Sequence, residues 1–116
     1  IYMSVTIESS GNLLVAYLIG EIDHHTSKDI REKIDNVITF KKPNHLVLDF
    51  KNVSFMDSSG IGLVMGRFRL MQTYYGSVEI KNVTPQTKKL MELAGLNGRD
   101  KLKGYRLDSA IVYEGK

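Results

Sequence analysis

Two adjacent serines lie where the start of a helix could hold a phosphate. Ser58 and Ser59 follow Asp57 and precede Gly60, and the apolar residues after them recur with helical spacing. The first turn of a helix leaves backbone N–H groups without intrahelical acceptors, and the helix dipole adds partial positive charge there. A phosphate at this position gains roughly 0.3–1 kcal/mol, and about 2 kcal/mol in good geometry. These residues predict a phosphorylation site, and helix physics alone does not choose between the two hydroxyls.

Helix capping is the alternative explanation of the same residues. An Asp or Ser at the N-cap accepts a hydrogen bond from the free N–H groups of the first turn. One cap is needed, yet Asp57, Ser58 and Ser59 stand in a row, so two hydroxyls remain beside the helix start. Because the helix end would accommodate a phosphate, phosphorylation should leave the fold intact. A switch at this position must then act on the binding of a partner.

The helix predicted over residues 58–75 carries two glycines one turn apart, and each costs about 1 kcal/mol relative to Ala. A projection at about 100° per residue places on the core face Ile61, Val64, Met65, Phe68, Met71 and Tyr75. The opposite side carries Gly62, Gly66, Leu63, Leu70 and Tyr74. This low, partly apolar surface either packs against a neighbouring helix that needs the glycines for close approach, or docks a partner beside the serines. The sequence leaves both explanations open.

The strands that must position this turn are predicted from short apolar runs. Residues 4–7 and 13–19 form a hairpin around the turn residues that include Gly11. Residues 46–50 are nearly all apolar, which predicts an interior strand covered on both faces. Residues 78–80 belong to the next strand, and a last strand is expected at residues 102–107.

Helix signals separate these strands. A first helix is expected to start at Thr26, with Asp29 in capping-box spacing, and to end before Pro43. Its core stripe contains Ile30, Ile34, Val37 and Ile38. Gly76 is expected to be the left-handed cap of the second helix. Thr84 and Pro85 start the third helix, which ends at Gly95, and a short helix follows Asp108.

The predicted order is β-β-α-β-α-β-α-β-α, an α/β fold with a mixed sheet and helices packed on it, in a single domain over residues 1–116. The length of 116 residues suits one core, and the absence of Cys suits a reducing compartment. The net charge is only +3 and the basic residues are scattered, which argues against nucleic acid as a partner. No apolar run is long enough for a membrane span. We therefore expect a cytoplasmic monomer that binds neither nucleic acid nor membrane.

Three blocks of residues together resemble the bacterial anti-sigma factor antagonists of the STAS domain family. The first is Ser54-Phe55-Met56-Asp57-Ser58-Ser59-Gly60-Ile61-Gly62. The second, Gly20-Glu21-Ile22-Asp23-His24-His25-Thr26, is similar to the sporulation branch of that family. The third is Pro85, Lys88-Lys89-Leu90 and Gly95-Leu96. The blocks keep the order of the family and span nearly the whole chain, although Asn97-Gly98-Arg99 is less apolar than the family pattern.

The resemblance implies a mechanism of partner switching without enzymatic activity and without a cofactor. The unphosphorylated antagonist binds an anti-sigma factor that is also a serine kinase, bound to ATP or ADP, and so releases a sigma factor for transcription of sporulation genes. The kinase phosphorylates the serine that matches Ser58, and a metal-dependent (PP2C-type) serine phosphatase restores it. The alternative is a phospho-regulated module of a general stress-response pathway.

The same resemblance implies which residues touch the partner. They are Asp23, His24, Met56, Asp57, Ser59, Gly60 and Ile61. A phosphoserine beside them adds about −1.5 to −2 charges. Desolvating that charge against a surface shaped for a hydroxyl costs several kcal/mol, and Asp57 adds a second negative charge.

Other site types lack part of their motif. Gly66 comes one residue late for the G-x-G-x-x-G of a dinucleotide site. Asp57 could accept a phosphoryl group as in receiver domains, but the chain opens with a hairpin and not with a strand–helix unit carrying paired acids. His24 and His25 are adjacent to Asp23, and adjacent residues do not share a helix face for metal or acid–base chemistry. His45 precedes a buried strand and is expected to be structural.

Overall fold

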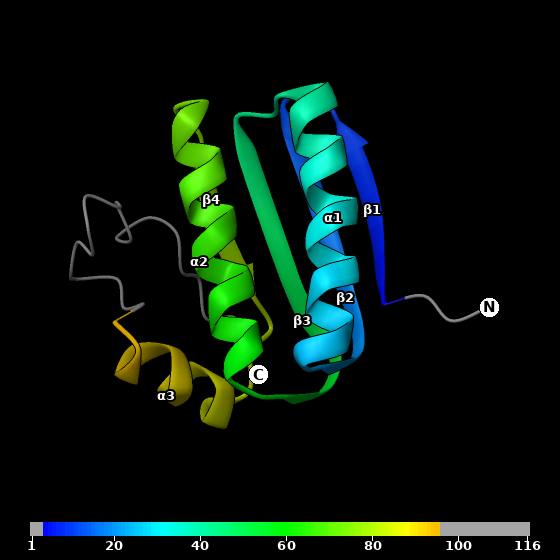
Figure 1. The fold of residues 1–116 in the computed structure, drawn as a ribbon. Coiled ribbons are helices and arrows are strands. Elements are labelled where there is room, and N and C mark those ends of the chain that lie inside the picture. Colours follow the sequence, from blue (N-terminus) through cyan, green and yellow to red (C-terminus); the bar gives the residue numbers. More distant parts are fainter. Residues whose placement is uncertain (1–3, 96–116) are drawn as a thin grey trace.

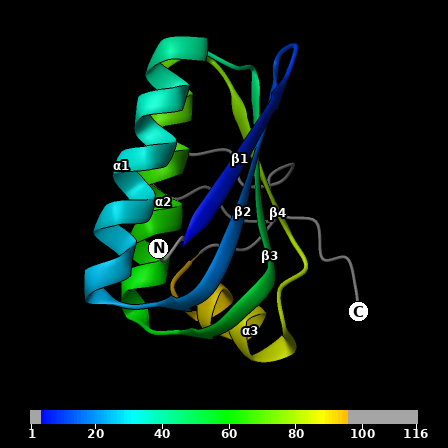
Figure 2. The same ribbon diagram turned by 90° about the vertical axis from the view of Figure 1, so that its right-hand side faces the viewer.

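A four-stranded mixed sheet carries two long helices on one face in the computed structural model, which describes residues 4–95 (Figures 1 and 2). The strands are β1 (Val5–Ser10), β2 (Leu13–Ile22), β3 (His45–Met56) and β4 (Ser77–Lys81). The helices are α1 (His24–Lys41), α2 (Ser58–Thr73) and α3 (Pro85–Leu93). The sheet order is β1-β2-β3-β4, with β1 antiparallel to β2 and the other pairs parallel. The predicted mixed sheet and element order are confirmed over these residues.

The hairpin forms as predicted, around a two-residue turn. Gly11 adopts a φ of 60°, which an L side chain rarely does, and Ser10 pairs with Leu13. Along β2 the alternation of a half-buried strand buries Leu14, Ala16 and Leu18. The core lies between this face of the sheet and the two long helices, where the α1 side chains Ile30, Ile34 and Ile38 are fully buried.

Strand β3 is longer than the sequence predicts. The apolar run covers residues 46–50, but the strand continues to Met56 because it pairs with β2 beyond the point where β4 ends. The pairing register shifts twice, between Tyr17 and Ile19 and again between Gly20 and Glu21, and Gly20 has a φ of 83°. The pairing ends with Ile22 opposite Met56. The extension carries the chain directly to the start of α2.

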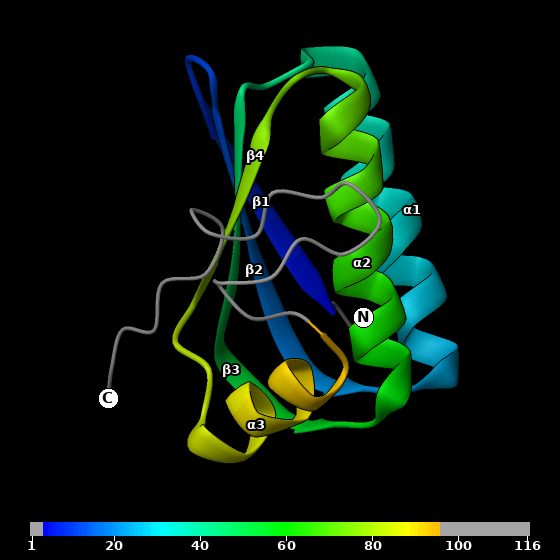
Figure 3. The ribbon, with the colours of Figure 1, turned by 90° about the vertical axis from the view of Figure 1, so that its left-hand side faces the viewer.

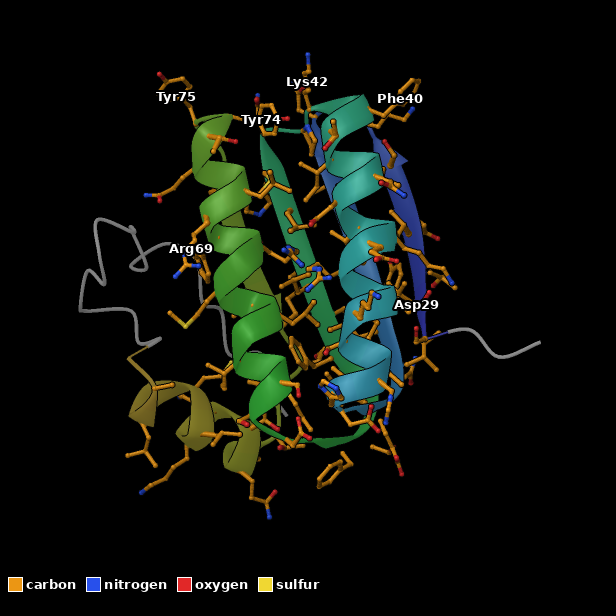
Figure 4. The ribbon with its side chains drawn as sticks, viewed as in Figure 1. Asp29, Phe40, Lys42, Arg69, Tyr74 and Tyr75 are labelled. Carbon is orange, nitrogen blue, oxygen red and sulfur yellow. The ribbon has the colours of Figure 1, made fainter. Side chains whose placement is uncertain are left out.

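Helix α1 begins two residues before the predicted start. Asp23, not Thr26, is the N-cap, and Thr26 is its capping-box partner three residues later. Asp29 instead accepts a hydrogen bond from the buried Ser4 hydroxyl (3.0 Å) and pairs with Lys33 (3.2 Å). Asp29 thus ties the beginning of the described chain to the outer side of α1 (Figure 4).

The end of α2 also differs from its prediction. Tyr75, not Gly76, is left-handed (φ 58°), and Tyr75 is 98% exposed although it was expected on the core face (Figure 4). Gly76 is needed for packing, because a Cβ there would lie 2.6 Å from Met71 Cε and 2.9 Å from the Asn44 carbonyl oxygen. Leu63, expected on the open side, is buried because α1 lies along that side of α2.

Helix α3 starts as the sequence predicts. Thr84 is the N-cap, its hydroxyl accepts from the Thr87 N–H (3.1 Å), and Pro85 takes the first helical position. It lies near the end of the molecule where α2 begins (Figure 3). The predicted strand at 102–107, the helix after Asp108 and Asn97-Gly98-Arg99 lie outside the described residues. Within residues 4–95, no helix is long and apolar enough to cross a bilayer.

Replacing Tyr75 with Gly should raise the free energy of unfolding by about 0.5–1 kcal/mol. A left-handed backbone costs an L side chain roughly 1–2 kcal/mol, and part of that gain is offset by the greater chain entropy of Gly. Urea denaturation measures the change. Tyr74→Gly is the control, because Tyr74 has a φ of −109° and packs against the core, so this variant should be less stable. A Tyr75→Gly protein less stable than wild type would contradict the prediction.

Candidate partner-binding and phosphorylation site

The starts of α1 and α2 lie side by side at one edge of the sheet. Strands β2 and β3 are parallel neighbours, so the segments that leave them emerge at the same end (Figure 1). The Asp57 N–H donates to the Ile22 carbonyl oxygen (3.1 Å) and joins the two exits. The structure therefore brings together the two blocks, Asp23-His24 and Met56 to Ile61, that are far apart in the sequence.

Asp57 is the N-cap of α2, so neither the Ser58 nor the Ser59 hydroxyl is needed to cap the helix. Its Oδ1 accepts from the Ser59 N–H (2.8 Å), and its carbonyl oxygen accepts from the Gly60 N–H (3.0 Å). Ser58 is exposed, and its hydroxyl has no hydrogen-bond partner within the described part of the chain. Ser59 is half-buried and faces the space between α1 and α2. The position at the helix start does not distinguish the Ser58 hydroxyl from the Ser59 hydroxyl, but their exposure does.

Met56, Gly60 and Ile61 form the underside of this turn. Gly60 is buried, and a Cβ there would overlap Sδ and Cγ of the Met56 side chain. Ile61 is only 9% exposed and belongs to the core. Met56 is half-buried. Gly60 and Ile61 therefore shape the site from below, and Met56 offers part of its side chain at the surface.

Asp23 organises the start of α1. Its Oδ1 accepts from the N–H groups of His25 and Thr26 (both 2.9 Å), and its own N–H donates to Thr26 Oγ1 (2.9 Å). The hydrogen bond from the Thr26 N–H is the largest cause that holds the pKa of Asp23 below its usual value, so the carboxylate stays ionised. His24 and His25 are exposed beside it, with ring centroids 5.2 Å apart.

Phe55 extends the site, although the sequence did not predict it as a contact residue. It is 54% exposed at the end of β3 and pairs with Glu21 of β2. Large apolar side chains exposed beside a polar site commonly mark protein contacts. The signal was present, since an aromatic residue lies directly between Ser54 and Met56, but the strand extension that exposes it was not predicted.

A depression of about 250 Å³ lies between the first turns of α1 and α2. Its lining residues are Ser27, Arg31, Ser59, Gly62 and Leu63. A Cβ at Gly62 or at Gly66 would meet no atom within 4 Å, so the described structure does not need either glycine for close helix packing. The sequence left two explanations open for these glycines: close packing of a neighbouring helix, or docking of a partner. The contacts do not support close helix packing.

One ion pair connects the two helices above this depression. Arg67 Nε lies 3.0 Å from Asp35 Oδ1, and the Arg67 side chain is only 5% exposed. Neither atom has an aligned hydrogen bond among residues 4–95, so this is a close charge contact. Burial raises the pKa of Asp35 and lowers that of Arg67, outweighing their mutual attraction. The pair was not predicted, because the projection of residues 58–75 did not assign Arg67 to a face.

His45 has the structural role that was predicted. Its Nδ1 lies 2.6 Å from Ser77 Oγ and its Nε2 lies 2.9 Å from Glu79 Oε1, so it links β3 to β4. Across residues 4–95, no three His, Asp or Glu side chains are grouped as metal ligands would be.

The chain belongs to the STAS domain family, whose model matches residues 4–105. Among characterised relatives, it is 36% identical over 94 residues to the anti-sigma F factor antagonist of Paenibacillus polymyxa, covering 81% of this chain and 80% of that protein. It is 29% identical over 94 residues to the anti-sigma-B factor antagonist of Bacillus subtilis (strain 168), covering 81% and 84%.

Two solved structures show the same fold. One is the anti-sigma factor antagonist SpoIIAA in its unphosphorylated form, with a TM-score of 0.67, 34% identity and coverage of 77% of this chain and 82% of that one. The other is the Bacillus cell fate determinant SpoIIAA in the phosphorylated form, with a TM-score of 0.72, 29% identity and coverage of 97% and 92%. Both forms of that protein therefore share this fold.

Two alanine substitutions in α2 should have opposite effects on stability. Gly62→Ala should raise the free energy of unfolding by about 0.5–1 kcal/mol, because Gly62 is exposed with open space around it. Gly60→Ala should lower it, because the new methyl group displaces the Met56 side chain. Chemical denaturation measures both variants. Equal changes of the same sign would show that Met56 does not constrain Gly60.

Proposed function

We propose that the chain is an anti-sigma factor antagonist controlled by phosphorylation of Ser58. In this proposal the unphosphorylated form binds an anti-sigma factor that is also a serine kinase, and so releases a sigma factor for transcription of sporulation genes. The observation that carries the proposal is the exposed Ser58 hydroxyl, without a hydrogen-bond partner among residues 4–95, at the positive end of α2. The likeness to SpoIIAA, solved in unphosphorylated and phosphorylated forms, supports it.

The proposed cycle is a phosphoryl transfer followed by a hydrolysis. The kinase transfers the γ-phosphoryl group of ATP to Ser58 Oγ, the hydroxyl proton leaves, and ADP remains on the kinase. A metal-dependent phosphatase then uses water to return serine and inorganic phosphate. The chain is the substrate in both steps and contributes an accessible hydroxyl on a rigid helix start.

Charge explains why the modification would change the partner and not the fold. The phosphate adds about −1.5 to −2 charges beside two carboxylates, Asp57 and Asp23, that already cap their helices. The first-turn N–H groups of α2 offset part of this repulsion within the chain. A partner surface shaped for a hydroxyl has no such compensation, and each 1.4 kcal/mol of desolvation costs about tenfold in affinity.

The proposed contact surface combines both helix starts. His24 and Phe55 offer exposed side chains, Met56 a partly exposed one, and Asp23, Asp57 and Ser59 offer polar groups. Gly60 and Ile61 lie beneath them. We place this monomer in the cytoplasm, where bacterial sigma factors direct transcription.

A general stress-response module is the second candidate. The 29% identity to an anti-sigma-B factor antagonist supports it, and the 36% identity to an anti-sigma F factor antagonist favours the sporulation pathway. The two differ in the sigma factor that is released. Co-purification from the native cell, followed by identification of the kinase that accompanies the chain, separates them.

Intact-mass spectrometry after incubation with the cognate kinase and ATP tests the modified residue. Wild type and Ser59→Ala should each gain one phosphoryl group (about 80 Da), and Ser58→Ala should gain none. Ser59→Ala is the matched control, because it removes the neighbouring hydroxyl and keeps the helix start. If all three proteins stay unmodified, the phosphorylation proposal is wrong, and if only Ser59→Ala fails, the acceptor is Ser59.

A further inference from the structure

One stripe of α1 faces one stripe of α2 along the seam between them. Each stripe repeats every four residues, so its members lie above one another on one helix face. On α1 they are Ser27, Arg31 and Asp35, and on α2 they are Ser59, Leu63 and Arg67. The third level is closed by the contact of Asp35 with Arg67. The first two levels line the depression, so the seam opens toward the helix starts.

The depression has the size of a side-chain site. Its volume of about 250 Å³ is below the roughly 300–1,000 Å³ of pockets for small molecules. Gly62 is among its lining residues and has no side chain that could fill it. Ser59, the residue after Ser58, forms part of its wall.

The charges of the seam do not balance. Arg31 and Arg67 carry two positive charges, and within residues 4–95 Asp35 is the carboxylate that interacts with both. Arg31 is exposed and makes no ion pair with any residue in 4–95. Arg67 is only 4% exposed, and its Nη1 has no hydrogen-bond partner among the same residues. Desolvation is the main cause that lowers the pKa of Arg67, and the positive charge of Arg31 adds to it.

We propose that this depression receives a carboxylate side chain of the anti-sigma factor, held by the Arg31 guanidinium and by the hydroxyls of Ser27 and Ser59. The inference rests on the proposed function and identifies the chemistry of the partner at the same site. A carboxylate supplies the missing negative charge, and its hydrogen bonds with a guanidinium are among the strongest in proteins. The lining combines apolar Leu63 with two hydroxyls and the Arg31 cation, and the Ser27 hydroxyl makes only a long hydrogen bond to the His24 carbonyl oxygen (3.4 Å). The cation favours an acidic side chain over a neutral one.

This arrangement also relates phosphorylation of Ser58 to the binding of the partner's carboxylate. A phosphate on Ser58 would lie at the start of α2, one residue before Ser59 and outside the lining of the depression that holds the partner's carboxylate. Its negative charge would repel the carboxylate that Arg31 holds. Like-charge juxtaposition at an interface costs several kcal/mol, so the partner would lose this contact while the antagonist keeps its fold.

The test compares two basic residues of the same helix for binding to the cognate anti-sigma factor. Arg31→Gln should weaken binding by unphosphorylated antagonist about tenfold or more, and Arg31→Lys should keep most of the affinity. Lys28→Gln is the matched control, because it removes one exposed positive charge of α1 outside the depression and should change affinity less than about threefold. Thermal unfolding of each variant checks that the fold is unchanged, as expected for exposed side chains.

Each outcome separates the inference from the function on which it rests. If wild type binds and phosphorylation abolishes binding, but Arg31→Gln and Lys28→Gln bind alike, the carboxylate site is wrong and the proposed function stands. If wild type does not bind the anti-sigma factor, both are wrong. If Arg31→Gln alone binds weakly and its affinity loses part of the salt dependence of wild type, the site is supported.

Discussion

The parallel pairing of β2 with β3 is the constraint on which the rest of the structure depends. It runs from Leu13 opposite His45 to Ile22 opposite Met56, far past the end of β4. One residue after each strand comes an aspartate that caps a helix, Asp23 for α1 and Asp57 for α2. Because the register is fixed up to the last pair, the two helix starts are held side by side. A slip of this register would separate the blocks that form the site.

Several features at this edge favour binding over stability. Exposed Gly62 costs helix stability where a side chain would meet nothing, and Phe55 leaves more than half of its surface in water. Burial raises the pKa of Asp35 and lowers that of Arg67, so desolvation opposes the attraction between the two charges. The position of the ion pair suggests a different role, because Asp35 of α1 contacts Arg67 of α2 directly above the depression. A fixed spacing of the two helices suits the proposed role of this surface, in which the Ser58 hydroxyl and the partner contacts share one face.

The sequence was sufficient where local signals decide the structure. The hairpin at Gly11, the Thr84-Pro85 helix start and the mixed sheet follow from turn chemistry and apolar runs, and the structure confirms them. The length of β3 did not follow, because residues 51–56 mix polar and apolar types without a clear strand pattern, and within residues 4–95 β2 is their strand partner. Likewise, Thr26 and Asp29 have the spacing of a capping box, but the exit of β2 places Asp23 at the cap. Local patterns could not show which of these tertiary contacts would form.

The candidate site divides in the same way. The two blocks and the surplus of hydroxyls over caps were visible in the sequence, whereas the relative exposure of Ser58 and Ser59 depends on where α1 lies. Leu63 and Arg67 face α1, and a projection of α2 alone assigned Leu63 to the open side. The depression at Arg31 exists only between two helices, so no single segment could reveal it.

The central claim is that a phosphate on Ser58 changes binding and not folding. Isothermal titration calorimetry of the anti-sigma factor with unmodified and with Ser58-phosphorylated chain tests it most directly. We expect the affinity to fall by about a hundredfold or more, since several kcal/mol of uncompensated charge are introduced at the contact. Equal affinities for the two forms would contradict the account and would leave the chain a constitutive binding domain.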